Sequence, residues 1–314
     1  MVSGPTGQPQ PTNLLPVPAR LLSSRANLGL IAAASSTLLV ALSVVATRYV
    51  VVRTDPLLLG FLRYFPAGLV FLPIVCRRFR KISLRDWPPI LGLGCLFYGI
   101  YPWLFSAALK YTTALHGALV LPLLPIFTLV LGNLLGRETL TRQKTAGIAV
   151  ALAGLILAIL EALSGAKSAA DAWKGDGLLV AGLALSAVFN VFSGPYILRY
   201  SALTITSVAM LAGGYALLAV VSISQSLALP AEFDVFDWVF VAFLSLGGAA
   251  LANYLWIVAL GLTVASRVAV FTLLSPIVVA VLSPVLLGEA PSFMTLVGGV
   301  LVISGITVAQ RGRA

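Results

Sequence analysis

The sequence contains one long stretch that occurs twice. Residues 110–138, KYTTALHGALVLPLLPIFTLVLGNLLGRE, are almost entirely apolar and carry two prolines near their middle. Residues 261–289, GLTVASRVAVFTLLSPIVVAVLSPVLLGE, repeat this pattern 151 positions later. Aligned without a gap, residues 87–154 and 238–305 share 17 identities in 68 positions. A unit of about half the chain is too long for a solenoid repeat, so the sequence predicts a duplicated fold.

The composition indicates that lipid is the solvent of this chain. It is 60% hydrophobic and 10% charged, whereas an average soluble domain is about 25% charged. The formal net charge of +10 does not favour nucleic-acid binding, because the basic residues lie in short clusters between apolar runs. Cys76 and Cys95 have no paired spacing, so we expect neither a disulfide nor a metal site.

Apolar runs of membrane-spanning length fill most of the sequence. A helix needs about 20 apolar residues to cross a bilayer. Ten such runs lie at 28–51, 57–76, 88–109, 113–135, 144–162, 176–197, 204–227, 238–260, 264–287 and 293–310. They lack the alternation of a porin strand, so they predict an all-α integral membrane protein of ten transmembrane helices. Residues 1–24, rich in Pro, Ser, Thr and Gly, are expected to form a disordered cytoplasmic tail.

The distribution of Lys and Arg predicts how the chain is oriented. With the N-terminus inside, 13 basic residues fall on the cytoplasmic side and 5 outside, and both termini are cytoplasmic. Each repeat then has five spans, so the second repeat, residues 172–310, is inverted relative to the first, residues 25–165. Inverted repeats are typical of secondary transporters, whose substrate binds near the midplane between them. A channel, a receptor and a membrane enzyme are the alternatives.

The phrases ALKYTTA at 108–114, LPIFTLVLGNLLGRETLT at 124–141 and GIAVALAG at 147–154 resemble the EamA family of the drug/metabolite transporter superfamily. A weaker echo lies at 259–305. In length and number of spans the chain is similar to bacterial amino-acid exporters of the YddG type. The resemblance implies export of aromatic and other neutral amino acids across the cell inner membrane. The positions that carry the family pattern are Ala108, Leu109, Tyr111, Thr112, Pro125, Gly136, Glu138, Gly147 and Gly154.

Polar and aromatic side chains inside the runs are candidates for the substrate pathway. Polar groups in hydrocarbon face the interior of a bundle. A zwitterionic solute needs hydrogen-bonding groups for its ends and an apolar wall for its side chain. The alternative is that the aromatic residues only pack or form interfacial belts. The candidates are Ser43, Tyr98, Tyr101, Asn190, Ser193, Asn253, Trp256, Thr272 and Ser275.

Four prolines inside two of the runs predict helix bends. A proline inside a helix removes one backbone hydrogen bond and kinks the helix. Such bends serve either as gating hinges or as fixed kinks that improve packing. They are Pro122 and Pro125 in the fourth run, and Pro276 and Pro284 in the ninth.

Two titratable residues are candidates for a charge or proton role. Arg63 lies inside the second run, where it should face water or an acidic partner, attract a carboxylate, or bind backbone carbonyls. His116 is the only histidine and is either a proton carrier or an interfacial residue. Because no Asp or Glu lies in the middle of a run, we favour transport driven by the substrate gradient and leave proton coupling open.

The sequence therefore predicts a secondary transporter and no enzyme. It contains no HExxH, GxSxG or Walker A motif and no Cys/His cluster, so we expect no catalytic residue, cofactor or metal. We expect a monomer that exports small amphipathic metabolites, chiefly amino acids, by alternating access. Spans 1–4 and 6–9 should line a central cavity, with spans 5 and 10 outside. The alternatives are export of cationic drugs or other metabolites, a channel-like facilitator, and a receptor or scaffold that does not transport.

Overall fold

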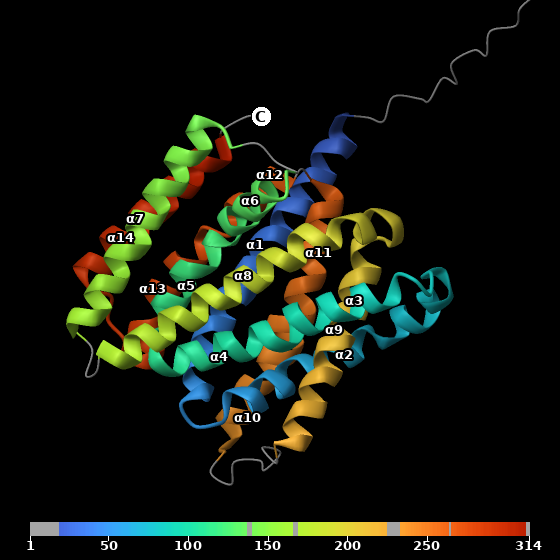
Figure 1. Ribbon diagram of the computed structural model, residues 1–314, viewed down its shortest axis with the longest axis horizontal. Coiled ribbons are helices and arrows are strands. Elements are labelled where there is room, and N and C mark those ends of the chain that lie inside the picture. The colour runs from blue at the N-terminus through green and yellow to red at the C-terminus, as the bar shows by residue number, and fades with distance from the viewer. Residues whose placement is uncertain (1–18, 137–139, 166–168, 225–232, 264, 312–314) are drawn as a thin grey trace, which may run out of the picture.

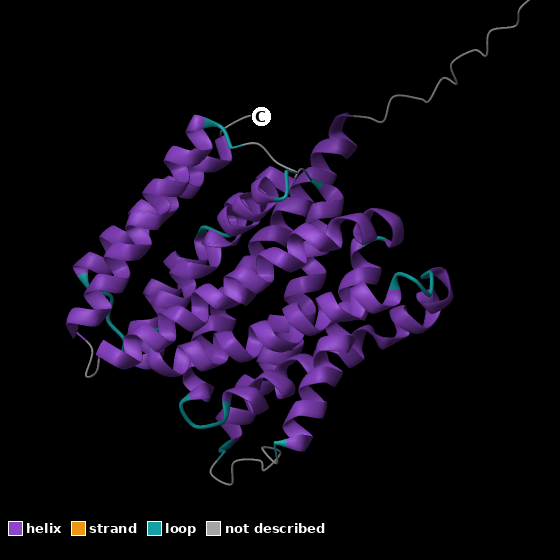
Figure 2. Ribbon diagram, in the orientation of Figure 1, coloured by secondary structure: helices purple, strands orange, loops and turns teal. Residues whose placement is uncertain are grey.

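The computed structural model describes residues 19–136, 140–165, 169–224, 233–263 and 265–311. Within these ranges all regular structure is helical (Figure 2). Helices occupy most of the described part of every apolar run. Seven segments are long and apolar enough to cross a membrane, namely Asn27–Val51, Pro56–Lys81, Trp87–Tyr111, Ala114–Leu134, Trp173–Tyr200, Ala202–Ile223 and Val235–Leu262. Two further apolar helices, Leu274–Leu287 and Phe293–Ala309, are shorter.

The helices follow one another through short connections. The first repeat comprises α1 (Ala19–Val51), α2 (Pro56–Arg78), the 3-10 turn η1 (Phe79–Lys81), α3 (Trp87–Gly94), the π-helix η2 (Cys95–Ile100), α4 (Tyr101–Tyr111), α5 (Ala114–Val120), the 3-10 turn η3 (Leu121–Leu123), α6 (Leu124–Leu134) and α7 (Arg142–Gly165). The second comprises α8 (Ala169–Tyr200), α9 (Ala202–Ile223), α10 (Val235–Ala242), the π-helix η4 (Phe243–Leu251), α11 (Ala252–Leu262), α12 (Ala265–Phe271), α13 (Leu274–Leu287) and α14 (Phe293–Arg311).

The repeat extends to backbone conformation. Thr112 ends α4 in an extended conformation with φ −126°, and Thr263, 151 residues later, ends α11 with φ −144°. The short helices α5 and α12 begin at equivalent positions, Ala114 and Ala265. A π-helix interrupts the preceding segment in both copies. The duplicated sequence therefore specifies the same succession of helix, π-segment, helix and break twice.

Corresponding helices of the two repeats run in opposite directions where they meet. Helices α7 and α14 lie side by side at one edge of the molecule (Figure 1). A Cβ on Gly154 would lie 2.6 Å from the carbonyl oxygen of Gly298, and Gly147 lies against Gly305. Rising numbers on α7 thus meet falling numbers on α14, so the pair is antiparallel. The peripheral position predicted for spans 5 and 10 is confirmed.

Small residues bring the helices close together. A Cβ on Gly213 of α9 would lie 2.5 Å from the backbone carbon of Tyr98. A Cβ on Gly94 of α3 would lie 2.6 Å from the Cα of Ala209. Helices in membranes associate through such close backbone approach, because lipid supplies no hydrophobic force between them. These contacts join the π-helix of the first repeat to a helix of the second.

Two boundaries differ from the sequence-based prediction. Helix α1 begins at Ala19, within the range 1–24 predicted as a tail, and residues 1–18 lie outside the described residues. The predicted fourth span is divided by η3 and the ninth by the turn at Thr272 and Leu273. Pro122 lies in η3, and Pro125 and Pro276 lie in the first turns of α6 and α13. Prolines fit a first turn because its N–H groups have no intrahelical acceptor.

Candidate functional site

A hydrogen bond between the two repeats joins the π-helix η2 to α11, the helix that directly follows the π-helix η4. Tyr98 of η2 is buried and donates its hydroxyl to Oδ1 of Asn253, in the first turn of α11, over 3.1 Å. Asn253 in turn donates to the carbonyl of Ala249 in η4 over 2.8 Å. π-segments inside helices are frequent at functional sites. Two of the predicted pathway residues are thus in direct contact.

Arg63 is a buried cation that is linked to this bond through the ring of Tyr64. Its side chain on α2 is 9% exposed, and Nη1 donates to the hydroxyl of Thr47 on α1 over 3.2 Å. Its guanidinium carbon lies 5.1 Å from the ring centroid of Tyr64, whose ring lies 5.7 Å from that of Tyr98. We call Thr47, Arg63, Tyr64, Tyr98 and Asn253 the Arg63 cluster. It joins helices of both repeats.

The charge of Arg63 has no acidic partner among the described residues. Its Nε is buried and makes no hydrogen bond within the described part of the chain. A cation–π contact of this kind contributes about 0.5–2 kcal/mol. Burying an unpaired ion costs several kcal/mol even after relaxation. The Arg63 cluster is therefore suited to an anionic group that the described residues do not supply.

Aromatic rings lie next to the Arg63 cluster. Phe97 stacks on Phe189 of α8 with centroids 4.4 Å apart, and on Tyr101 with centroids 5.7 Å apart. The Tyr101 ring also packs against Gly182 of α8, where a Cβ would lie 3.0 Å from the ring. Tyr98 meets Phe97 edge to face at 4.8 Å. An apolar aromatic surface is thus adjacent to a buried cation, as a site for an amphipathic anion or zwitterion requires.

The other predicted pathway residues lie in different surroundings. Ser43 is buried on α1 against Gly248 of η4 and donates to the carbonyl of Leu39. Asn190 is exposed on α8 and donates to Thr128 of α6 over 3.3 Å. Trp256 belongs to an apolar cluster with residues of α1 and α12.

Three further predicted pathway residues and one predicted helix-bend proline lie elsewhere in the fold. Ser193 is buried on α8. Thr272 lies in the turn between α12 and α13. Ser275 is buried in α13, and its hydroxyl has no hydrogen-bond partner in the part of the chain that the structure describes. Pro284 lies inside α13. The structure therefore brings together Tyr98, Tyr101, Asn253 and Arg63, and leaves the remaining predicted residues outside that group.

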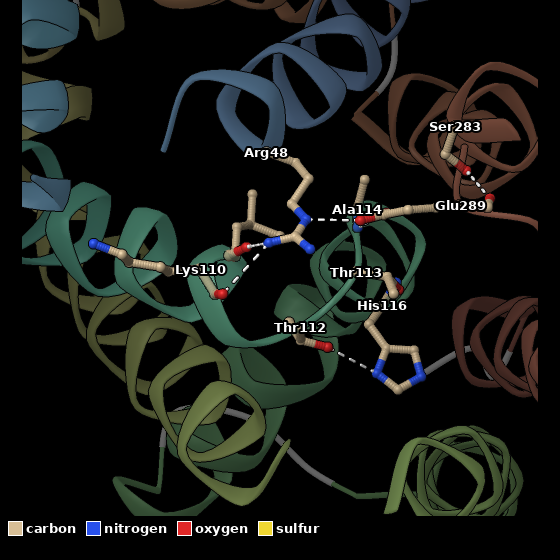
Figure 3. A network of polar contacts seen from close by, with 9 residues as sticks. Arg48, Lys110, Thr112, Thr113, Ala114, His116, Ser283 and Glu289 are labelled. Atoms are coloured by element: carbon tan, nitrogen blue, oxygen red, sulfur yellow. Dashed lines mark hydrogen bonds and ion pairs between the residues drawn. The ribbon is translucent and has the colours of Figure 1, made fainter. Parts of the chain in front are cut away.

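A second polar network holds the junction between α4 and α5 (Figure 3). Arg48 at the end of α1 donates through Nε to Glu289 over 2.7 Å and through Nη1 to the carbonyl of Leu109 over 2.7 Å. The same nitrogen lies 3.4 Å from the carbonyl of Lys110. Glu289 accepts the N–H of Ala114 through its other oxygen over 2.9 Å. Charges from α1 and from the end of α13 thus clamp one break in the predicted pathway helices.

His116 is buried beside this junction. It is 6% exposed, and its Nδ1 lies 3.1 Å from the hydroxyl of Thr112 and 3.7 Å from Oδ1 of Asp176 on α8. The His116 side chain is therefore enclosed by the protein. Asp176 is a partner of His116 that the sequence did not predict. The only available signal was its position at the start of an apolar run.

A third network lies at the opposite end of the segment Trp87–Tyr111. Asp86 accepts a hydrogen bond from the Tyr200 hydroxyl and a charged one from Arg199 Nη1, the latter over 2.6 Å. These two donors, Tyr200 above all, hold the pKa of the Asp86 carboxyl below its usual value. The start of α3 is thereby tied to the end of α8.

A chain with several helices that can cross a bilayer, arranged as two copies of one unit, defines a multi-pass helical membrane protein. The model of the EamA-like transporter family matches residues 27–160 and 173–310. The chain belongs to this family, so it is a transporter of the EamA type. The two matched segments correspond to the two structural repeats.

Individual relatives are named transporters. An uncharacterized transporter of Archaeoglobus fulgidus is 28% identical over 277 residues, covering 87% of this chain and 95% of the relative. A probable amino-acid metabolite efflux pump of Salmonella typhimurium is 30% identical, covering 81% and 85%. A probable terminal-alkyne amino-acid exporter of Streptantibioticus cattleyicolor is 29% identical, covering 74% and 76%. One crystal structure matches with a TM-score of 0.61 over 91% of this chain and 96% of the other, at 23% identity, which shows the fold.

Proposed function

We propose that this protein exports amino acids across the cell inner membrane by alternating access. Ten spans, in two inverted units at residues 25–165 and 172–310, would enclose a central pathway, with both termini in the cytoplasm. The antiparallel contact of α7 with α14 supports the inversion, because these helices are equivalent in the two repeats. The distribution of basic residues supports the orientation. The protein would act as a monomer.

The buried, unpaired guanidinium of Arg63 is the observation that carries the amino-acid proposal. A substrate carboxylate would supply the missing anion through charge-assisted hydrogen bonds to Nε and the remaining guanidinium nitrogen. The two relatives whose names mention amino acids support the same substrate class. Phe97, Tyr101 and Phe189 would contact the apolar or aromatic side chain of the substrate.

Asn253 would complete the recognition of the substrate. Its Oδ1 accepts from Tyr98 and its Nδ2 donates to Ala249, so the amide is held in a fixed orientation. A carbonyl-type oxygen with a second lone pair can accept a hydrogen bond from an ammonium group. The Arg63 cluster would then bind both ends of a zwitterion. Because it joins both repeats, binding would depend on how the repeats lie relative to each other.

Counterflow in proteoliposomes that contain only this protein tests transport. Vesicles are loaded with unlabelled phenylalanine or threonine, and uptake of the same labelled amino acid is followed. We expect transient accumulation that requires the internal solute. Uptake without saturation or counterflow would instead identify a channel-like facilitator. If none of the amino acids tested is taken up, the proposed substrate class is excluded, and cationic drugs or other metabolites become the favoured substrates.

The role of Arg63 is tested by changing the protein and the substrate together. Arg63→Gln removes the charge, and we expect the half-saturating phenylalanine concentration to rise about ten- to a hundredfold, the range for a charged hydrogen bond. Phenethylamine lacks the carboxylate. It should inhibit phenylalanine transport by the wild type only weakly, and it should compete with phenylalanine on equal terms in the Arg63→Gln variant. Arg267→Gln is the matched control, since Arg267 is exposed on α12. An unchanged half-saturating concentration in Arg63→Gln would exclude Arg63 as the carboxylate ligand.

A further inference from the structure

Two titratable side chains meet inside the protein, outside the Arg63 cluster. His116 on α5 and Asp176 on α8 are 6% and 5% exposed, and their nearest atoms, Nδ1 and Oδ1, are 3.7 Å apart. The two residues belong to different repeats. Buried ionisable groups in membrane-spanning segments are costly, so their presence indicates a function.

The hydrogen bonding of this pair is incomplete. The Thr112 hydroxyl lies 3.1 Å from Nδ1 of His116, within hydrogen-bond distance, whereas the 3.7 Å to Asp176 is too long for one. The other carboxyl oxygen of Asp176, Oδ2, is buried and has no partner among the described residues. Such an orphaned oxygen is costly as part of a carboxylate. A proton placed on the carboxyl group, or shared with the imidazole, would lower that cost.

The nearby charges on the surrounding elements are engaged with other groups or lie at the surface. From α1 and the end of α13, Arg48 and Glu289 bind each other. From α4 and α8, Lys110, Tyr111 and Lys174 are exposed, with Lys174 over the Tyr111 ring at 5.8 Å. The residues of α7 and α14 that belong to the apolar cluster around α5 are all apolar, namely Ile148, Ala151, Leu155, Ala158, Val302 and Ile306. The ion-pair contact that His116 makes within the described residues is the one with Asp176.

His116 is joined to the junction that Arg48 and Glu289 clamp. Its N–H donates to the side chain of Thr113, which caps the start of α5, over 3.3 Å. The neighbouring N–H of Ala114 donates to Glu289 (Figure 3). A change in the charge of His116 thus acts within the same helical turn that the clamp holds. These contacts are the route by which protonation of His116 would act on the junction.

We propose that His116 and Asp176 form a proton-binding site whose occupancy opposes substrate binding, so that export is linked to proton entry. The proposal rests on the proposed transport function. The ligand is a single proton, held on the imidazole or on the carboxyl group, and histidine is the side chain suited to exchanging it near neutral pH. Because linkage is reciprocal, substrate binding must then release protons from the pair.

Proton release on substrate binding is the direct test. Phenylalanine binding to the purified full-length protein is measured by calorimetry in two buffers of different ionisation enthalpy, across pH 5.5–8.5. We expect release of up to one proton per phenylalanine, and a binding constant that changes by up to about tenfold per pH unit. The His116→Asn and Asp176→Asn variants should bind phenylalanine without releasing a proton. Proton uptake, no proton exchange by the wild type, or undiminished release by both variants would overturn the proposal.

A second measurement separates this proposal from the proposed function. The melting temperature of the protein without substrate is followed over the same pH range for the wild type, both variants and Lys174→Gln, an exposed control on α8. We expect the wild type and the control to share a pH-dependent component that both variants lack. Such a pH-dependent component of the melting temperature supports the proton site even if phenylalanine is not a substrate. Identical pH profiles for all four proteins would overturn the proton site and leave the export proposal intact.

Discussion

Gly147 of α7 and Gly305 of α14 lie against each other, and their equivalents in the repeat, Gly298 and Gly154, make the same contact further along. Gly147 corresponds to Gly298, and Gly154 corresponds to Gly305, each 151 residues later in the chain. The interface therefore has a local two-fold pseudosymmetry, with two equivalent helices packed antiparallel. This relationship is the most direct structural expression of the duplicated sequence.

Alanine at Gly147 or Gly305 should destabilise the protein. A Cβ on Gly147 would lie 2.6 Å from the carbonyl oxygen of Gly305, so the helices would have to separate. We expect a clearly lower melting temperature of the detergent-purified protein. Gly194→Ala is the control, because nothing lies within 4 Å of a Cβ there, and alanine favours a helix by about 0.5–1 kcal/mol over glycine. Equal melting temperatures for Gly147→Ala and Gly194→Ala would show that the close approach is not required.

Arg48 and Glu289 should depend on each other. Each forms bonds to the α4–α5 junction in addition to their ion pair. Their side chains are partly exposed, so we expect a coupling near the low end of about 0.5–3 kcal/mol. Arg48→Gln and Glu289→Gln should each lower thermal stability and slow counterflow. The double variant should be little worse than either single one. Fully additive losses would mean that the two residues act separately.

The helical runs and their repetition could be predicted from the sequence, because a bilayer admits only segments whose backbone bonds are internally satisfied. Arg63 could be identified as a candidate site residue for a related reason, since a charge inside an apolar run is visible in the sequence. The π-helices could not, because Cys95–Ile100 and Phe243–Leu251 have ordinary apolar compositions. Their register depends on contacts with other helices, such as that of Gly213 with Tyr98.

The burial of Asp176 could not be predicted from the sequence either, because it also depends on contacts between helices. It stands near Asp171 and Lys174 in the chain, so the sequence predicts only an acidic residue at the outer end of a span. Its burial comes from α8 packing across α5, and this brings it to a histidine 60 positions earlier in the chain. Local hydropathy contains no information on such a contact. A pairing between repeats therefore has to be read from the tertiary structure.

Tyr101 and Asn190 test the predicted substrate pathway at two places. Tyr101 lies in the aromatic group beside Arg63, and Asn190 binds Thr128 across α8 and α6. We expect Tyr101→Ala and Asn190→Ala to change the counterflow rate or half-saturation while both proteins still insert into the membrane and purify as the wild type does. Leu198→Ala, at a highly exposed position of α8, is the control. Wild-type transport by both variants would exclude this assignment of the pathway.

Asp86 should stabilise the fold in a pH-dependent manner. Its hydrogen bonds to Tyr200 and Arg199 lower its pKa in the folded state relative to the unfolded chain. The stabilisation is therefore fully present above the ordinary aspartate pKa of about 3.9, and it is lost as pH falls through the lower folded pKa. Asp86→Asn should reduce the melting temperature at pH 7, and its difference from the wild type should shrink steadily below pH 4. Tyr200→Phe, which removes the leading cause of the shift, should reproduce part of this effect. A difference that is absent at pH 7, or that persists undiminished in acid, would show that the charged form of Asp86 does not hold α3 to α8.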